Sequence, residues 1–253
     1  MNITLSTFRL ILYIWIGIAV GVFFLLLKIK APYGRYSSSK WGPLVDNHYG
    51  WLIMEFPAMA VMLFTFVLCF SNTSVVIEIM VGLFCLHYIN RTIIFPFRLH
   101  TRGKKMPWVI VISGIFFNGV NTFSLGYYFC HFATEPNSYI TDPKFIAGVI
   151  LFFTGLVINW SADNRLIHLR APGETGYKIP RGWLFNYISC PNLLGELMEW
   201  GGFALLCWNL PALCFFIWSA ANLLPRAMAH HQWYKNEFTD YPAERKAVIP
   251  FLL

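Results

Sequence analysis

Seven long apolar stretches constrain this chain more than any other feature of its sequence. They cover residues 10–27, 51–70, 75–97, 108–129, 145–163, 193–210 and 212 to about 226. Most come close to the ~20 residues that a helix needs to cross a bilayer. Hydrophobic residues make up 57% of the 253 residues and charged residues only 12%, which is too apolar for an ordinary soluble domain. Lipid is therefore the expected solvent.

Helices are the expected spanning elements, so the chain is predicted to be an all-α polytopic membrane protein with about seven transmembrane helices. Open sheet edges cannot face lipid, and the stretches are too long and unbroken for the strands of a barrel. Asn209-Leu210-Pro211 separates the last two stretches, because proline cannot continue a helical hydrogen-bond ladder. The first stretch has no small-residue cleavage site before Lys28 and is expected to remain in place. No repeat or linker divides residues 1–253, which predicts a single domain.

The basic residues predict the orientation of the chain. Sixteen of the nineteen Lys and Arg residues lie in the loops after the first, third and fifth stretches and in the C-terminal tail. The exceptions are Arg9, Arg91 and Lys144. Cytosolic loops of membrane proteins carry an excess of Lys and Arg. With seven spans, this pattern predicts an N-terminus outside and a C-terminus in the cytosol.

The cysteines carry no metal or disulfide signal. Most of the six lie inside apolar stretches, and no two form a Cys-x-x-Cys pair. They are therefore expected to act as small core hydrophobes. They are Cys69, Cys85, Cys130, Cys190, Cys207 and Cys214.

Glu55 and Tyr88 are the polar residues that lipid should tolerate least. Glu55 lies about five residues into the second stretch, where an ionised carboxylate costs several kcal/mol unless it is paired or neutral. At a rise of ~1.5 Å per residue, Glu55 and Tyr88 lie roughly 7 and 13 Å below the same membrane face. A tyrosine hydroxyl beside a carboxyl can donate to a developing oxyanion, which predicts a site that polarises a carbonyl group. The alternatives are a carboxylate at the headgroup boundary and a tyrosine of the interfacial belt.

Several spans bring further polar residues to the same half of the membrane. Arg and His suit phosphates, Asn, Asp and Glu suit ribose hydroxyls and amides, and Tyr or Trp can stack on a flat ring. This inventory favours a dinucleotide, although a solvated helix end would explain any single group. The residues are the i,i+4 pair Asn159 and Asp163, then Asn192, Glu196 and Glu199, and the one-face series Arg226, His230 and Tyr234.

Other cofactor devices and chemistries are disfavoured. No GxGxxG or Walker loop occurs, so the membrane helices themselves are expected to hold the cofactor. No metal is expected, because Glu-x-x-His is missing from the inward spans and His-x-x-His clusters are absent. Nothing resembles a nucleophile elbow or a basic nucleic-acid motif.

A series of motifs runs along nearly the whole chain. They are Pro32-Tyr33-Gly34-Arg35, Glu55-Phe56-Pro57, Gly82 to Tyr88 with Arg91-Thr92, Gly126-Tyr127-Tyr128, Asn159-x3-Asp163, Arg170-x-Pro172-Gly173-Glu174, Tyr177-x-Ile179-Pro180, Asn192 to Trp200, Arg226-Ala227 and Tyr241 to Pro250. Together they resemble the steroid 5α-reductases, 3-oxo-5α-steroid 4-dehydrogenases that use NADPH. The C-terminal part also resembles sterol and enoyl reductases, whereas Glu55 and His87-Tyr88 are similar to the steroid branch.

The resemblance implies a reaction and a cofactor site. Glu55 and Tyr88 would bind the C3 carbonyl of a 3-oxo-Δ4-steroid, NADPH would deliver hydride to C5 on the alpha face, and the enolate would be protonated at C4. The cofactor box would lie mainly in residues 159–250. The implied cofactor residues are Tyr33, Arg91, Arg102, Asn159, Asp163, Arg170, Tyr177, Asn192, Glu196, Arg226, His230 and Tyr234; Arg102 is included for its place in an Arg-Gly loop.

The chain departs from the family pattern at two places. Ile89-Asn90 stands where mammalian members have an aromatic residue and a histidine, so the steroid preference is left open. Ala229-His230-His231 stands where they have three histidines. The helical face assigns the cofactor histidine to His230, with His231 as the alternative.

Other functions are weighed beside this one. They are reduction of another lipid such as polyprenol or enoyl-CoA, an isoprenylcysteine-type carboxyl methyltransferase, and a transporter in which Glu55 is an ion-coupling carboxylate. The expected partners are a lipophilic steroid and membrane lipid, with no nucleic acid and no obligate protein partner. The expected location is the endoplasmic reticulum or a bacterial inner membrane, with the cofactor site facing the cytosol.

Overall fold

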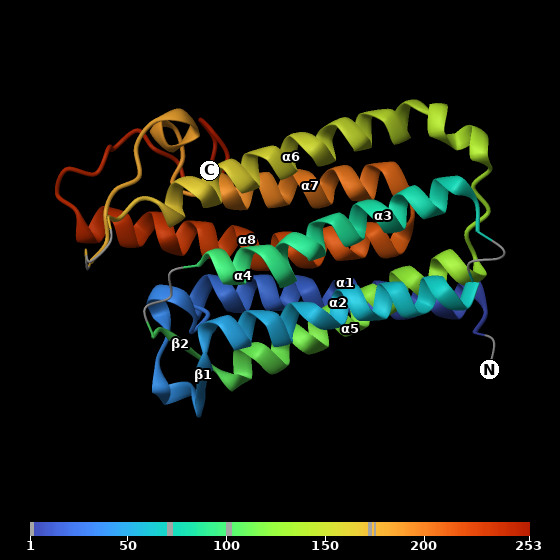
Figure 1. Cartoon of the computed structure of the whole chain (residues 1–253), viewed down its shortest axis with the longest axis horizontal. Coiled ribbons are helices and arrows are strands. Elements are labelled where there is room, and N and C mark those ends of the chain that lie inside the picture. Colours follow the sequence, from blue (N-terminus) through green and yellow to red (C-terminus); the bar gives the residue numbers. More distant parts are fainter. Residues whose placement is uncertain (1–2, 70–72, 100–102, 172–173, 175) are drawn as a thin grey trace.

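The computed structural model describes residues 3–69, 73–99, 103–171, 174 and 176–253. Within them, seven long helices run along the longest axis of the molecule (Figure 1). The third, α3, continues through a π-helical turn (Asn90–Ile94) into α4 (Phe95–Arg98). The long helices are α1 (Leu5–Lys28), α2 (Asn47–Cys69), α3 (Val75–Ile89), α5 (Trp108–His131), α6 (Pro143–Ile167), α7 (Pro191–Cys207) and α8 (Leu210–Glu237).

The predicted all-α polytopic architecture is confirmed. Six helices of the described residues are long and apolar enough to cross a membrane, and the seventh predicted span forms α7, which has 17 residues. The break before Pro211 is also confirmed, because Asn209 Oδ1 caps α8 by accepting a hydrogen bond from the Ala212 amide at 2.9 Å. α8 continues to Glu237, past the apolar stretch that ends at about residue 226, and includes His230 and Tyr234, as their predicted one-face series requires.

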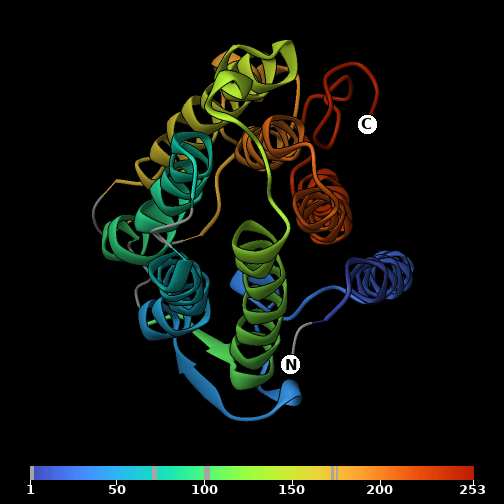
Figure 2. The same ribbon diagram turned by 90° about the vertical axis from the view of Figure 1, so that its right-hand side faces the viewer.

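Seen along the helices, α1 lies at the edge of the bundle and packs mainly against α8 (Figure 2). The two helices meet through Trp15 and Trp218, whose ring centroids are 4.3 Å apart. The largest buried cluster lies further in, where Phe84 of α3 contacts Trp200 of α7 and Phe215 of α8. Tyr88 packs on the same phenylalanine, at 4.8 Å between centroids. The aromatic core therefore supports one of the predicted catalytic residues directly.

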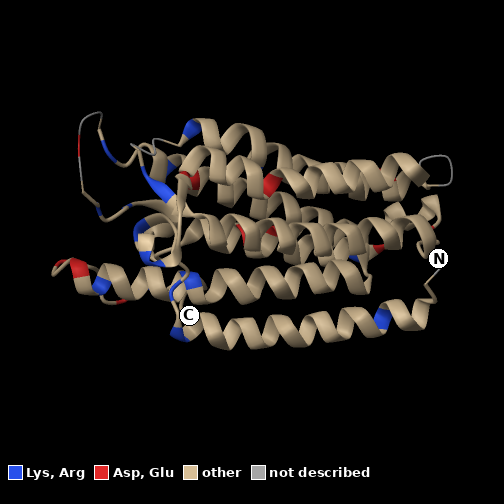
Figure 3. Cartoon of the chain, turned by 90° about the horizontal axis from the view of Figure 1, so that it is seen from below, with Lys and Arg blue, Asp and Glu red and all other residues tan. Residues whose placement is uncertain are grey.

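The end of the bundle that carries the C-terminus holds the short elements and most of the charge. Lys and Arg gather there, and few lie toward the end that carries the N-terminus (Figure 3). The short elements are β1 (Leu44–Asp46), which pairs antiparallel with β2 (Lys105–Pro107), and the 3-10 helices η1 (Gly34–Tyr36), η2 (Ser39–Trp41) and η6 (Trp183–Asn186). Another 3-10 helix, η5 (Asn137–Thr141), precedes α6. We call the charged end the basic end.

Helices α6 and α7 form an antiparallel pair with touching backbones. A Cβ atom at Gly155 would lie 2.4 Å from the Glu199 nitrogen, and one at Gly195 would lie 2.4 Å from the Asn159 nitrogen. Small residues permit such close approach between membrane helices. The contact places Asn159 of α6 against the first turns of α7, where Asn192 lies.

We expect Gly155→Ala to lower the thermal midpoint of the protein and to weaken dinucleotide binding. The added methyl group would force two backbones apart, at a cost of about 1–3 kcal/mol. The control is Gly21→Ala in α1, where an added Cβ meets nothing within 4 Å. Thermal unfolding of both purified variants checks this expectation. Equal midpoints for the two would contradict it.

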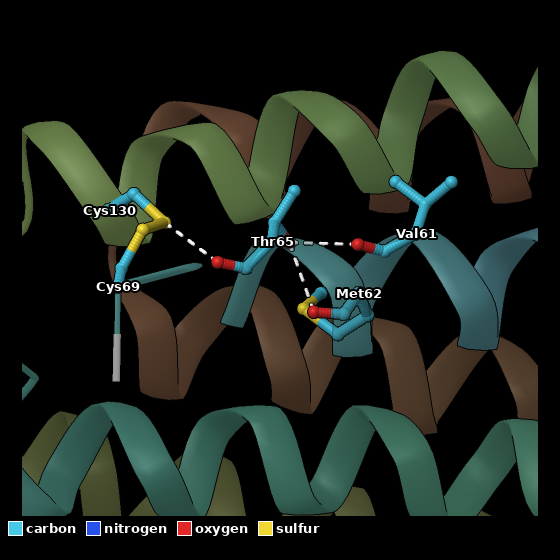
Figure 4. Close-up of a disulfide and its surroundings, with 5 residues drawn as sticks. All are labelled: Val61, Met62, Thr65, Cys69 and Cys130. Atoms are coloured by element: carbon cyan, nitrogen blue, oxygen red, sulfur yellow. Dashed lines mark hydrogen bonds between the residues drawn. A yellow bond between two sulfur atoms is a disulfide. The ribbon is translucent and has the colours of Figure 1, made fainter. Parts of the chain in front are cut away.

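Helices α2 and α5 form a second close pair, which runs in parallel. Along it, Gly114 receives Met54, and Gly126 receives Thr65, whose Oγ1 would lie 2.1 Å from an added Cβ. At the end away from the basic end, a disulfide joins Cys69 to Cys130 (Figure 4). The pair is thus interlocked along its length and covalently closed at one end.

This disulfide corrects the sequence-based expectation for two of the six cysteines. Cys69 and Cys130 are 61 residues apart in the chain, whereas their Cα atoms lie 5.4 Å apart, a normal distance for a bridged pair. No short-range spacing indicates such a bond, because it depends on α2 and α5 lying side by side. Among the described residues, the other four cysteines are free, and three of them are buried.

Candidate active site

Glu55, Tyr88 and Asn118 form one hydrogen-bonded group from three helices. The Tyr88 hydroxyl donates to Asn118 Oδ1 at 3.0 Å. Asn118 Nδ2 donates to the Met54 carbonyl oxygen at 2.6 Å and to Glu55 Oε2 at 3.3 Å. Tyr88 and Asn118 are each 3% exposed. The structure thus brings the two predicted catalytic residues together, with an amide between them.

Arg91 lies three residues after Tyr88, on the π-helical turn that follows α3. Single π-turns often occur at functional sites. The Arg91 guanidinium lies over the Trp51 ring at 4.9 Å and pairs with Glu196 of α7 at 3.8 Å. Arg91 therefore links the group of Glu55, Tyr88 and Asn118 on α2, α3 and α5 to the polar residues on α6 and α7.

The close contact of α6 and α7 aligns three of the predicted cofactor residues. Asn159 Nδ2 donates to the Asn192 carbonyl oxygen at 3.0 Å, and Asn192 Nδ2 donates to Asp163 Oδ1 at 3.0 Å. Each of Asn159 and Asp163 keeps one buried oxygen without a hydrogen-bond partner in the described part of the chain. The pair of helices therefore presents two acceptors to a ligand.

The one-face series on α8 packs against the segment Tyr33–Tyr36, called the η1 segment here. Arg226 lies over the Tyr33 ring at 3.4 Å, and His230 stacks on Tyr36 with ring centroids 5.8 Å apart. Arg35 Nη2 donates to the Tyr234 hydroxyl at 3.4 Å. All three predicted residues of α8 thus face the same segment. Burial raises the pKa of Tyr36, although Arg35 and Arg226 act against it.

The structure separates the two histidines of α8. His231 Nδ1 is hydrogen-bonded to Ser189 Oγ at 2.6 Å, and the same oxygen contacts the Tyr241 hydroxyl at 2.6 Å. His230 Nδ1 is buried and has no hydrogen-bond partner in the described part of the chain. His231 is therefore tied to the C-terminal segment, whereas His230 Nδ1 has no such bond; this difference is compatible with the predicted role of His230.

Three cations surround the Tyr177 ring at the basic end. Arg35, Lys104 and Arg170 lie 4.9, 5.0 and 5.9 Å from its centroid, and Lys104 Nζ donates to its hydroxyl at 3.2 Å. Within the described residues, none of the three forms an ion pair with a carboxylate. This uncompensated group, called the cation cluster below, suits a phosphate. Arg102 lies outside the described residues.

Sequence reasoning missed two residues of this site. They are Asn118 and Lys104. Arg35, His87 and Glu199 occur in the sequence motifs, but the place of Arg35 beside Tyr177 and the contact of His87 Nδ1 with Glu199 Oε1, at 2.8 Å, were not predicted. Asn118 carried a readable signal, because Asn118, Asn121 and Thr122 fall on one helical face within a membrane span. Lys104 carried none beyond the general basic character of its loop.

The residues present fit a dinucleotide. Buried polar atoms of native proteins are rarely left unpaired, so those without a partner mark places for a polar ligand. The unpaired atoms include two cationic or imidazole nitrogens and two oxygens, which match phosphate, ribose and amide groups. Four of the thirteen such atoms in the described residues lie at this site: Arg35 Nη1, His230 Nδ1, Asn159 Oδ1 and Asp163 Oδ2; others, such as Glu135 Oε2 and Asn209 Nδ2, lie elsewhere in the bundle.

The fold and site define a class: a polytopic helical membrane protein that holds an acid–tyrosine pair and a cation-lined polar site within one bundle. The family model for 3-oxo-5-alpha-steroid 4-dehydrogenase matches residues 104–253. The chain belongs to this family, as its motifs predicted.

Similar proteins extend the match to nearly the full length. The 3-oxo-5-alpha-steroid 4-dehydrogenase 1 of Rattus norvegicus is 40% identical over 230 residues, which is 90% of this chain and 88% of that protein. The steroid 5-alpha-reductase DET2 of Solanum lycopersicum is 37% identical over 251 residues, or 98% and 97% of the two chains. The 3-oxo-5-alpha-steroid 4-dehydrogenase 2 of Macaca fascicularis is 38% identical over 240 residues, or 93% of each.

Proposed function

We propose that this chain is an NADPH-dependent reductase of the C4–C5 double bond of 3-oxo-Δ4-steroids, which yields 5α-reduced 3-oxosteroids. The observation that carries the proposal is the group formed by Tyr88, Asn118 and Glu55. It places a phenol and a carboxyl together inside a membrane bundle, where a lipophilic ketone can meet them. The family membership and the names of its relatives supply the steroid.

The proposed chemistry follows from the conjugated enone. Addition of a hydride at C5 moves electrons through C4 and C3 onto the C3 oxygen, and protonation at C4 completes the saturated ketone. Glu55 and Tyr88 donate hydrogen bonds to the C3 oxygen as its charge grows, and such donors act most strongly where water is excluded. When bound, NADPH supplies the hydride for C5.

The chain's own residues would hold this cofactor in three groups. Arg226, His230 and Tyr234 of α8 with Tyr33 suit the pyrophosphate, since they combine cations with hydrogen-bond donors. Asn159, Asp163, Asn192, Glu196 and Arg91 suit the amide and hydroxyl groups. The cation cluster with Tyr177 suits the adenosine end.

The cation cluster also supports NADPH over NADH. The two cofactors differ by the 2′-phosphate, which adds negative charge at the adenosine ribose. Arg35, Lys104 and Arg170 offer positive charge that no carboxylate of the described residues pairs with. Arginine binds phosphate with two parallel hydrogen bonds, which makes it well suited to such discrimination.

We also propose that the basic end faces the cytosol. The loops there carry most of the Lys and Arg residues. The disulfide lies at the other end, and structural disulfides persist in oxidising compartments outside the cytosol. Two independent features therefore support the same orientation.

Cysteine labelling tests directly whether Cys69 and Cys130 form a disulfide. We expect membranes that are denatured without reductant and treated with a maleimide polymer to show labelling of four of the six cysteines. Denaturation is needed because buried thiols are inert; burial raises the pKa of Cys190 to about 12. After reduction, all six should react. In the control Cys69→Ser, all five cysteines should react without reductant. Labelling of six cysteines in the unreduced wild type would contradict the assignment.

The activity itself is tested with purified protein in detergent, NADPH and testosterone or progesterone. The expected product is the 5α-reduced 3-oxosteroid. If no 4-en-3-one yields a 5α-reduced product, the proposed function is wrong. Binding of S-adenosylmethionine without binding of NADPH would instead favour a methyltransferase.

A further inference from the structure

Asn118 lies between Glu55 and Tyr88, the two residues proposed to bind the steroid carbonyl, but has no role of its own in the proposed chemistry. It is the described residue whose side chain is hydrogen-bonded to both Glu55 and Tyr88. We propose that Asn118 is a positioning residue that sets the placement of the Glu55 carboxyl relative to the Tyr88 hydroxyl and directs the proton of each. This inference rests on the proposed function.

The orientation of the Asn118 amide is fixed by its backbone partner. The Met54 carbonyl oxygen can only accept a hydrogen bond, so the amide nitrogen must be the atom that lies 2.6 Å from it. The amide oxygen therefore points at Tyr88, and in this bond the Tyr88 hydroxyl must be the donor. On the other side, Glu55 Oε2 must be an acceptor.

This arrangement assigns an order to the two proton donors. When Glu55 is protonated, its proton lies on Oε1, because Oε2 already receives the amide N–H. That proton is free for a steroid carbonyl. The single phenolic proton of Tyr88 is held by Asn118 until a substrate oxygen with growing negative charge competes for it. Asn118 thus makes Glu55 the first donor and keeps Tyr88 in reserve for the transition state.

The position of Asn118 is itself held firmly. Its helix, α5, packs closely against α2 at Gly114, which precedes Asn118, and at Gly126, which follows it. A Cβ atom at Gly114 would displace Met54, and one at Gly126 would displace Thr65. Tyr88 lies on α3, outside this interlocked pair. The amide is therefore the hydrogen-bonded connection between the rigid α2–α5 pair and the tyrosine.

The test compares Asn118→Leu with Asn121→Leu. Leucine is close to asparagine in size and removes all three side-chain hydrogen bonds, those with Tyr88, Glu55 and the Met54 carbonyl oxygen. Asn121 is a matched control, because it is 2% exposed on the same helix and is hydrogen-bonded to Trp15 and the Phe117 carbonyl instead. We expect Asn118→Leu to lower kcat by about 10- to 100-fold with a smaller change in KM, as a misplaced donor pair would. Asn121→Leu should keep the wild-type kcat.

A spectroscopic measurement separates positioning from stability. The enone absorption of a 4-en-3-one moves to longer wavelength when its carbonyl accepts strong hydrogen bonds. With NADP⁺ present to prevent turnover, the bound steroid should show this shift in wild type and in Asn121→Leu, and a reduced shift in Asn118→Leu. The thermal midpoint and NADP⁺ affinity of Asn118→Leu, measured in parallel, should show a folded protein that still binds cofactor.

Two results would overturn the inference. One is a wild-type kcat and enone shift in Asn118→Leu; the other is equal losses in both variants, which would mean that any buried amide of α5 is needed for folding. Either result leaves the proposed function standing if the wild type reduces the steroid. A wild-type protein that neither reduces a 4-en-3-one nor shifts its absorption would overturn both.

Discussion

Glu55→Gln and Tyr88→Phe are each expected to abolish measurable turnover of a 4-en-3-one while leaving NADPH bound. Both changes keep the size of the side chain. Tyr88→Phe removes an O–H donor from the group around Asn118, and Glu55→Gln replaces the acidic O–H of the carboxyl with the far less acidic N–H of an amide. Loss of a single donor to a developing oxyanion lowers kcat by about 10²- to 10³-fold. Here Tyr88 and Asn118 are each only 3% exposed, so the loss should lie at the upper end.

The measurements are steroid turnover by product analysis and NADPH affinity by fluorescence titration. Tyr13→Phe serves as the control for the tyrosine, because Tyr13 is 59% exposed on the outer face of α1. Glu237→Gln is the control for Glu55→Gln, because Glu237 lies at the exposed end of α8. Both controls should retain wild-type activity. A loss of NADPH binding in Glu55→Gln or Tyr88→Phe would show that these residues belong to the cofactor site instead.

Arg35→Gln and Arg170→Gln are expected to weaken NADPH binding strongly and NADH binding little. Each removes one cation from the cation cluster around Tyr177. A hydrogen bond to a charged group contributes about 1.5–3 kcal/mol, which corresponds to roughly a 10- to 150-fold change in affinity. The double variant should lose most of its preference for the 2′-phosphate.

Titration with 2′,5′-ADP and with 5′-AMP gives the same comparison without catalysis. The matched control is Arg181→Gln, because Arg181 is an exposed arginine of the basic end that already pairs with Asp240 at 2.9 Å. It should bind both nucleotides as the wild type does. Equal weakening of the two nucleotides in Arg35→Gln, or the same effect in Arg181→Gln, would contradict phosphate recognition by the cluster.

The membrane fold was predictable from sequence because the bilayer itself sets the length of each span. The apolar stretches and the break at Pro211 therefore map onto helices directly. Only the ends were imprecise: α8 keeps a helical backbone to Glu237, beyond its apolar part. Loss of hydrophobicity marks where lipid ends, not where a helix ends.

The candidate site was predictable only in part, since its residues come from segments far apart in the chain. Glu55 and Tyr88 could be paired from their depths, because depth follows from position along a helix. Asn118 could not be placed between them, since its contact depends on how α5 rotates against α2. The same holds for Cys69 with Cys130, which only helix packing brings together.

Loop residues illustrate the same limit. Arg35 and Lys104 approach Tyr177 from separate connections, and loop conformation has no period from which proximity could be read. The different surroundings of His230 and His231 were also unreadable from sequence. Ser189, a residue outside α8, is hydrogen-bonded to His231, whereas His230 Nδ1 has no hydrogen-bond partner among the described residues.

The central claim is that this chain transfers hydride from NADPH to C5 of a steroid whose C3 carbonyl is held by Glu55 and Tyr88. Testosterone and NADPH deuterated at the reactive nicotinamide carbon test it most directly, with the product analysed by mass spectrometry and NMR. The prediction is one deuterium at C5 on the alpha face, with none incorporated by Glu55→Gln or Tyr88→Phe. A reduced product without deuterium at C5, or full incorporation by both variants, would contradict the account.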